Sequence, residues 1–95
     1  MTTSIPPDER IKTVSIEPEH LTVHLMDGRR ISTPLAWYPR LAGATQQELE
    51  KWEIIGAGEG LHWEQFDEDL SVKGMLKGFP AAGYKSKSTN FKIKP

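Results

Sequence analysis

The sequence has no cysteine among its 95 residues. This absence excludes disulfide bonds, thiolate metal sites, iron–sulfur clusters and a cysteine nucleophile. The sequence also lacks any run of about 18 consecutive apolar residues, the length that a membrane-spanning helix needs. The first ten residues, MTTSIPPDER, have neither the basic start nor the apolar stretch of a signal peptide. We therefore expect a soluble protein of the reducing cytoplasm that does not enter a membrane.

Acidic side chains are missing from residues 70–95. All 13 Asp and Glu lie in residues 1–69 with 6 of the 12 Lys and Arg, and residues 70–95 hold the remaining 6 as lysines. The formal net charge of −1 thus hides an acidic body and a basic end. Such an end could bind a nucleic acid, an acidic partner or the body itself. It is equally consistent with lysines that only keep a chain terminus hydrated.

Apolar and polar residues alternate in the first part of the chain, which predicts β-strands. A first strand of about seven residues, from residue 11 to residue 17, would bury Val14 and Ile16. A second strand over HLTVHLM would point Leu21, Val23 and Leu25 inward and its histidines outward.

The second strand is followed by a hairpin signal. Asp27-Gly28 between two alternating runs predicts a type I′ turn, in which both central residues have positive φ. The third strand, RRISTPL, ends at Pro34, which cannot donate a ladder hydrogen bond and so marks a strand end or sheet edge. Together these signals predict a three-stranded antiparallel meander.

A helix near residues 45–54 is predicted by a capping box at its start. Thr45 and Glu48 have the spacing at which each side chain accepts a hydrogen bond from the other residue's backbone N–H. The following glycines at positions 56, 58 and 60 resemble a phosphate-binding loop only superficially, because no strand-helix-strand unit surrounds them. We interpret them as turn residues.

The stretch GLHWEQFDEDLSVKGML predicts a short strand followed by a second helix near residues 70–77, with Asp67 or Asp69 as its N-cap. The fold class is therefore α+β, with a small antiparallel sheet made of the three-stranded meander and one or two short strands. We expect a flexible N-terminus over residues 1–9, one domain over residues 10–78, and a basic, disordered tail over residues 79–95. Apolar residues that this tail could use on binding are Phe79, Tyr84, Phe91 and Ile93.

The segments DGRRISTPLAWYPRL and WEIIGAGEGLHWEQFDEDLSVKGML closely resemble DUF2442, a bacterial family of unknown function. With the strand pair before Asp27 and the helix near Thr45, the resemblance covers roughly residues 10–77. It implies a small α+β domain that is frequently encoded beside a predicted toxin and is proposed to be its antitoxin. Some relatives precede a helix-turn-helix domain, which this chain lacks, so the resemblance implies protein recognition rather than autonomous DNA binding.

The acidic run Asp67, Glu68 and Asp69 allows three interpretations. With His62 it could form an acid/base or metal site, but the sequence fixes no geometry for one. It could cap a helix, or its surplus acids could join an aromatic and charged patch of the kind enriched at protein interfaces. We expect no catalytic residue, cofactor or metal. The predicted partner-binding residues are Trp37, Tyr38, Arg40, His62, Asp67, Glu68 and Asp69.

The sequence thus predicts a non-enzymatic protein-binding module, an antitoxin-like partner of a small bacterial toxin. The alternative is a nucleic-acid-binding accessory protein that sets the basic tail against phosphates. A small hydrolase is a third hypothesis, but the sequence shows no nucleophile and base pattern for it. Pairing between exposed strand edges leaves a homodimer open. The lysines of the nucleic-acid alternative are Lys85, Lys87, Lys92 and Lys94.

Overall fold

The computed structural model describes residues 6–81, which form six short strands and several short helices. In chain order the elements are β1 (Ile11–Ile16), β2 (His20–Leu25), β3 (Arg30–Pro34), η1 (Leu35–Trp37), α1 (Pro39–Ala42), α2 (Gln46–Leu49), β4 (Glu53–Ile55), β5 (Gly60–Trp63), η2 (Glu64–Phe66), β6 (Glu68–Ser71) and α3 (Val72–Lys77). The α+β class predicted from the sequence is confirmed. No helix in the described part of the chain is long and apolar enough to cross a membrane.

The first sheet is the predicted meander, with strand order β1-β2-β3 and antiparallel pairing throughout. Leu21, Val23 and Leu25 are buried, as the alternation predicted. Ile11 is also buried, although regular alternation along β1 would place it on the face opposite to Val14 and Ile16. The register between β1 and β2 shifts between Ile11 and Thr13. Such a bulge inserts one residue and reverses the face on which the preceding side chains lie.

The hairpin between β2 and β3 differs from the predicted type I′ turn. Gly28 has a φ of 96°, but among the described residues other than glycine only Asp67 has a positive φ. The loop is closed by hydrogen bonds from Gly28 N to Leu25 O and from Leu25 N to Arg29 O. The type I′ prediction is therefore wrong, because only the glycine is left-handed.

The second sheet has the order β4-β5-β6. The sequence predicted one small sheet made of the meander and one or two short strands, whereas the structure has six strands in two separate sheets. β6 occupies residues that we had expected to lead directly into a helix. The helix α3 begins only at Val72, and the Ser71 hydroxyl caps it by accepting a hydrogen bond from Gly74 N at 2.9 Å. The prediction that Asp67 or Asp69 caps this helix is wrong, since both precede its start by several residues.

The helix α2 begins with the predicted capping box. The Glu48 N–H donates to Thr45 Oγ1 at 3.1 Å, and the Thr45 N–H donates to Glu48 Oε1 at 2.9 Å. The helix is only one turn long and ends well before residue 54, because β4 begins at Glu53. Pairing of β4 with β5 takes the residues that would have extended the helix.

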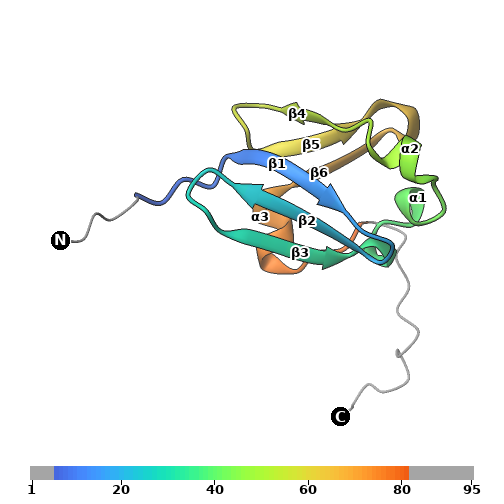
Figure 1. Ribbon diagram of the computed structural model, residues 1–95, viewed down its shortest axis with the longest axis horizontal. Helices are drawn as coiled ribbons and strands as arrows, with labels where there is room; N and C mark the ends of the chain where they lie inside the picture. The colour runs from blue at the N-terminus through green and yellow to red at the C-terminus, as the bar shows by residue number, and fades with distance from the viewer. Residues whose placement is uncertain (1–5, 82–95) are drawn as a thin grey trace, which may run out of the picture.

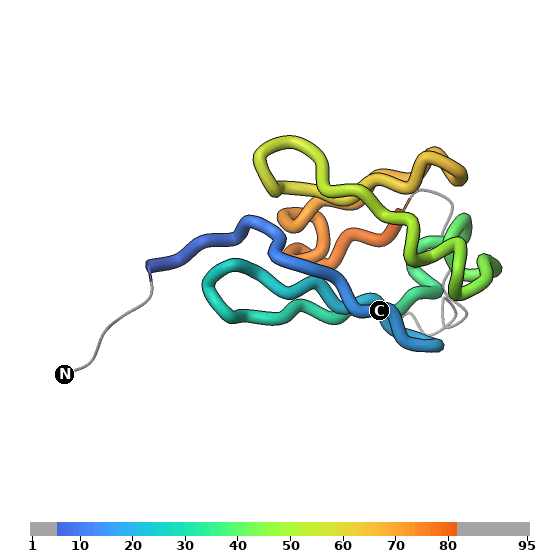
Figure 2. The backbone as a smooth tube through the Cα atoms, turned by 45° about the horizontal axis from the view of Figure 1, so that its top comes forward, coloured from blue at the N-terminus to red at the C-terminus, as the bar shows by residue number. Residues whose placement is uncertain are grey.

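One hydrophobic cluster joins the two sheets and α3. Figure 1 shows the sheet of β4, β5 and β6 beside the sheet of β1, β2 and β3, with α3 behind β2 and β3 and with α1 and α2 gathered at one end. The turned view in Figure 2 separates the two sheets clearly. The buried apolar residues of the core are Ile11, Val14, Ile16, Leu21, Val23, Leu25, Leu35, Tyr38, Leu41, Leu49, Leu61, Trp63, Leu70, Val72 and Met75.

Residues 79–81 remain attached to the domain beyond the expected boundary at residue 78. The Phe79 N–H donates to Gly74 O at 3.0 Å, and the Ala81 N–H donates to Trp37 O at 3.1 Å. The rest of the predicted tail, residues 82–95, lies outside the described residues, as do residues 1–5. The predicted disorder of both termini remains a prediction there.

Candidate functional site

The three consecutive acids at 67–69 point in different directions. Asp67 ends η2 in the left-handed conformation, with φ 52° and ψ 45°. Glu68 and Asp69 then lie in β6, where successive side chains alternate between the two faces. Glu68 is 8% exposed and turned toward the core, whereas Asp69 is exposed. They therefore do not converge on one metal or one reacting group.

His62 lies between two carboxylates on the outer face of the second sheet. Its Nδ1 is 2.5 Å from Asp69 Oδ1, and its Nε2 is 2.9 Å from Glu64 Oε1. The hydrogen bond to Asp69, followed by the one to Glu64, raises the pKa of His62 to about 9. The imidazole is therefore protonated at neutral pH and donates through both nitrogens, which leaves neither free to bind a metal or accept a proton.

Strand register extends this arrangement into a row across the sheet. Glu53 of β4 pairs with His62 of β5, and His62 pairs with Asp69 of β6. Because paired residues point to the same side of a sheet, the three side chains share the outer face. We define the acidic face as Glu53, Glu59, Glu64 and Asp69 around His62, and all four carboxylates belong to exposed residues.

A recess opens on this face next to the row. Its volume is about 400 Å³, and its lining includes Ile55, Glu59, Gly60, Asp69 and Ser71. A Cβ at Gly60 would lie 2.7 Å from the Leu70 carbonyl oxygen, so a side chain cannot be added there without a shift of the backbone. The glycine therefore keeps β5 close to β6 at the bottom of the recess.

Arg40 contacts the turn that begins the acidic run. Its Nη1 donates to Asp67 O at 2.7 Å and to Phe66 O at 3.4 Å. These carbonyl groups lie at the end of η2, where a cation can satisfy acceptors that the helix leaves unpaired. Arg40 therefore supports the left-handed turn at Asp67 while remaining exposed.

Two of the predicted partner-binding residues are buried, so they cannot contact a partner on the folded domain. Tyr38 is 1% exposed, and its hydroxyl donates to Thr33 Oγ1 at 2.9 Å. Burial raises the pKa of the Tyr38 hydroxyl and that of the Glu68 carboxyl. Tyr38 and Glu68 therefore do not belong to the predicted interface, because the alternation of β6 and the packing of η1 turn their side chains inward.

Trp37 is half-buried rather than fully exposed. Its ring packs against the core and lies edge-on to Tyr38, with the ring centroids 6.5 Å apart. The structure thus brings His62 together with Asp69, and Arg40 together with Asp67, but it does not gather all seven predicted residues into one patch. The four lysines of the nucleic-acid alternative lie outside the described residues.

Sequence reasoning missed the glutamates of the acidic face. Glu53 was assigned to the end of a helix and Glu64 was only one polar residue of a short strand. The alternation of polar and apolar residues through EDLS could have indicated the strand β6. Pairing of β6 with β5 places Asp69 and His62 on one face, which is the face that the missed glutamates share. Acids before an apolar run favour a helix start equally well, and this ambiguity hid the strand.

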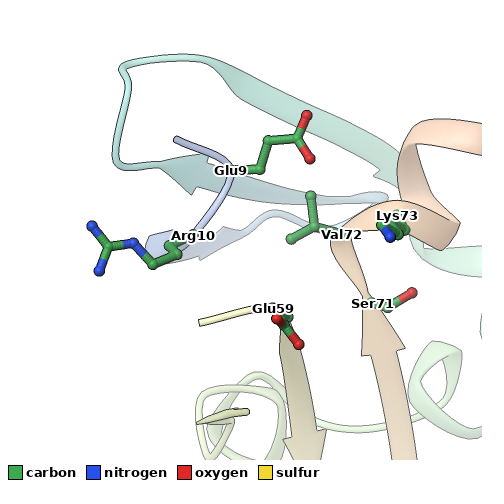
Figure 3. A pocket seen from close by; sticks show the side chains of 6 residues that line it. All are labelled: Glu9, Arg10, Glu59, Ser71, Val72 and Lys73. Atoms are coloured by element: carbon green, nitrogen blue, oxygen red, sulfur yellow. The ribbon is translucent and has the colours of Figure 1, made fainter. Parts of the chain in front are cut away.

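A second recess, of about 380 Å³, lies where β6 runs into α3 (Figure 3). The lining residues are Glu9, Arg10, Glu59, Ser71, Val72 and Lys73. The charged ends of Glu9, Arg10 and Lys73 point in different directions, and Val72 stands among them. The described residues also contain no group of three or more His, Asp or Glu side chains placed to hold a metal ion.

Ser15 and His24 form a hydroxyl–imidazole pair on the outer face of the first sheet, with Ser15 Oγ 2.9 Å from His24 Nε2. This contact between neighbouring strands was not predicted from the sequence. A serine nucleophile requires a histidine that is itself oriented by a third group. No hydrogen bond to His24 Nδ1 is seen within residues 6–81, so the pair does not reach that arrangement.

Comparison with known proteins identifies related chains without assigning an activity. The family model described as "Protein of unknown function (DUF2442)" matches residues 11–81. A crystal structure of a protein of unknown function from Rhodospirillum rubrum is 32% identical, with a TM-score of 0.68 over 78% of this chain and 92% of that one. An NMR structure of an uncharacterised protein from Chromobacterium violaceum is 24% identical, covers 78% of this chain and 70% of that one, and shares the fold with a TM-score of 0.66. No curated protein matches the chain.

Proposed function

The chain belongs to the DUF2442 family, and from this premise we propose that it is a non-enzymatic protein-binding module whose acidic face binds a basic protein. The observation that carries the proposal is the row of Glu53, His62 and Asp69 in register across three strands. Exposed carboxylates spread across a sheet face suit the recognition of a basic protein surface. The partner we propose is a small toxin, which this protein would bind as an antitoxin-like inhibitor.

Electrostatic complementarity would guide the two proteins together. The carboxylates of Glu53 and Glu59 make no hydrogen bond to another side chain within residues 6–81, so they are available to lysine or arginine side chains of a partner. Opposite charges across an interface accelerate association and select the correct partner. His62 would hold Asp69 and Glu64 in place through its two hydrogen bonds, which reduces the side-chain entropy lost on binding.

The proposal places the protein in the cytoplasm, since a chain without cysteine is suited to a reducing compartment.

Catalysis is disfavoured by the same geometry that supports binding. The His62 imidazole is engaged through both nitrogens, and the buried Glu68 faces the core rather than a recess that a substrate could enter.

The test is copurification from a cell extract with the full-length chain as bait. We expect recovery of one basic protein, and we expect its loss when Glu53→Lys and Glu59→Lys reverse the charge of the acidic face. The matched control is Glu17→Lys with Glu19→Lys, two exposed glutamates at the β1–β2 turn of the other sheet. Equal recovery with both double variants would contradict the proposal.

The nucleic-acid alternative predicts a different result from the same experiment. Nucleic acid would be recovered in place of a basic protein, and substitution of Lys85 and Lys87 by Glu would abolish its recovery. The logarithm of the binding constant would fall linearly with the logarithm of salt concentration, with a slope of about −0.9 for each phosphate neutralised on a duplex. A basic protein partner retained by the lysine variants would instead support the acidic face.

A further inference from the structure

The outer face of the first sheet is polar and accessible to solvent. Figure 1 shows α3 behind β2 and β3, and the apolar side chains of β2 are buried on that side. Strand register places two rows of polar side chains on the opposite face, because paired residues point to the same side of a sheet. Neither row contains an acidic residue. The first row is Thr13, His24 and Arg30, and the second row is Ser15, Thr22 and Ser32.

The bulge in β1 adds a second cation to the first row. The register shift between Ile11 and Thr13 leaves Lys12 as the extra residue of this strand. Lys12 and Thr13 are both exposed, although neighbouring residues in a regular strand lie on opposite faces. Bulges re-aim side chains in this way and are frequent beside functional sites. Lys12 and Thr13 therefore stand together at the β1 end of the row, and Arg30 stands at its β3 end.

A recess of about 360 Å³ lies among these side chains, beside the loop between β2 and β3. All 13 Asp and Glu of the chain belong to the described residues, yet none of them lines this recess, whereas three basic residues do. Arg29 is held by Asp27 in a salt bridge at 2.9 Å. Lys12 and Arg30 are exposed and form no salt bridge within residues 6–81, so their charges are available to a ligand. The lining residues are Lys12, Thr13, His24, Leu25, Gly28, Arg29 and Arg30.

We propose that this recess binds the phosphate group of a small phosphorylated molecule. The guanidinium of Arg30 and the ammonium of Lys12 supply charge-assisted hydrogen bonds, which phosphate oxygens accept. The Thr13 hydroxyl is a neutral donor beside them. His24 contacts the Ser15 hydroxyl through Nε2 at 2.9 Å, and this hydrogen bond orients the imidazole at the centre of the row.

A second recess, of about 290 Å³, adjoins the first and shares His24 and Arg30 with it. The hydroxyl groups of Thr22 and Ser32 are hydrogen-bonded to each other there, and each can form a further hydrogen bond as donor or acceptor. The polar body of the ligand, of the polyol class, lies in this second recess while its phosphate occupies the first. The lining residues are Ser15, Glu17, Thr22, His24, Arg30 and Ser32.

The surroundings of the recesses favour a compact ligand over a strand of nucleic acid. Single-stranded nucleic acid is bound through aromatic side chains that stack on its bases and through a basic groove that follows its backbone. Neither row contains Phe, Tyr or Trp, and the cations stand only at one end of the face. At the other end, Glu17 and Glu19 lie in the turn between β1 and β2 and would repel a continuing phosphodiester backbone.

The test is NMR titration of the full-length, isotope-labelled chain with glycerol phosphate, inorganic phosphate and glycerol at constant ionic strength. We expect both phosphates to shift the amide signals of Thr13, His24 and Arg30 until saturation, with glycerol phosphate binding more tightly. Glycerol alone should leave these signals unchanged. Lys12→Gln with Arg30→Gln should weaken the binding of glycerol phosphate about tenfold or more, because two charge-assisted hydrogen bonds are lost.

Lys51→Gln with Lys77→Gln is the matched control, because it removes the same charge at two exposed positions outside both recesses. The signals of the buried Leu21 should stay the same in both double variants, which shows that the fold is intact. Equal binding of glycerol phosphate by the two double variants would overturn the proposal, since general charge would then explain the binding.

Two other results would also overturn the proposal. Equal or tighter binding of inorganic phosphate would show that the ligand is the free ion, and shifts with oligothymidylate alone would show that the face follows a nucleic-acid backbone. The phosphate site lies on the first sheet, whereas the acidic face lies on the second sheet. Titration of the site needs no protein partner, so its failure and the failure of the proposed function are separate results.

Discussion

At the scale of single residues, the stabilising contribution of His62 should depend on pH. Its pKa is raised from 6.5 to about 9 by Asp69 and Glu64, so the folded chain binds a proton that the unfolded chain releases between these values. This contribution is fully present below pH 6.5 and is lost as the pH rises through about 9. The melting temperature should therefore fall across this range.

Asp69→Asn removes the larger cause of the raised pKa and should flatten the decrease in melting temperature. His20→Asn serves as the control, because His20 is exposed on the other sheet. The measurement is thermal unfolding followed by circular dichroism at several pH values. A pH dependence that is identical in the Asp69 variant and in the unaltered chain would show that His62 is not the group responsible.

Gly60 tests the close approach of β5 to β6. A Cβ there would lie 2.7 Å from the Leu70 carbonyl oxygen, so Gly60→Ala should lower the free energy of unfolding by about 1–3 kcal/mol through overpacking. A Cβ at Gly43 would meet no atom within 4 Å, and Gly43→Ala should change stability by about 0.5 kcal/mol or less. Urea unfolding measures both, and equal midpoints for the two variants would contradict the packing described for the recess.

At the scale of secondary-structure elements, the cap of α3 can be assigned by mutation. Ser71→Ala removes the acceptor for the Gly74 N–H and should cost about 1 kcal/mol of unfolding free energy. Lys73→Ala, at an exposed position of the same helix, should cost much less. The measurement is chemical unfolding of the two variants. A negligible loss of unfolding free energy in Ser71→Ala would show that Ser71 is not the cap of α3.

The elements whose local signals agreed were predictable from the sequence. The inward residues of β2 and the capping box at Thr45 each rest on one spacing rule, and the structure confirms both. The burial of Ile11 could not be predicted, because it depends on a bulge created by pairing with β2. β6 was missed since acids before an apolar run fit a helix start as well as a strand, and only pairing with β5 decides between them.

The candidate site was predicted only in part, for the same reason. His62 and Asp69 were chosen individually, but the row that joins them to Glu53 depends on strand register. Glu68 and Tyr38 were chosen as surface residues and are buried, because the alternation of β6 and the packing of η1 are tertiary properties. The sequence shows which charged side chains are present, but the pairing of the strands determines which of these side chains contact one another.

At the scale of the whole molecule, two small sheets share one core, and the second sheet carries carboxylates on its outer face. The basic end of the chain follows this acidic domain, although the formal net charge is only −1. Reversing charges on the acidic face should therefore weaken the binding of a basic protein partner.

The most direct test of the central proposal is the affinity of the recovered basic partner for the full-length chain and its two double-glutamate variants, measured by calorimetry. Glu53→Lys with Glu59→Lys should weaken binding by about tenfold or more, equivalent to a loss of at least about 1.4 kcal/mol. Glu17→Lys with Glu19→Lys should leave the dissociation constant nearly unchanged. Equal weakening by both double variants, or no weakening by either, would contradict recognition through the acidic face.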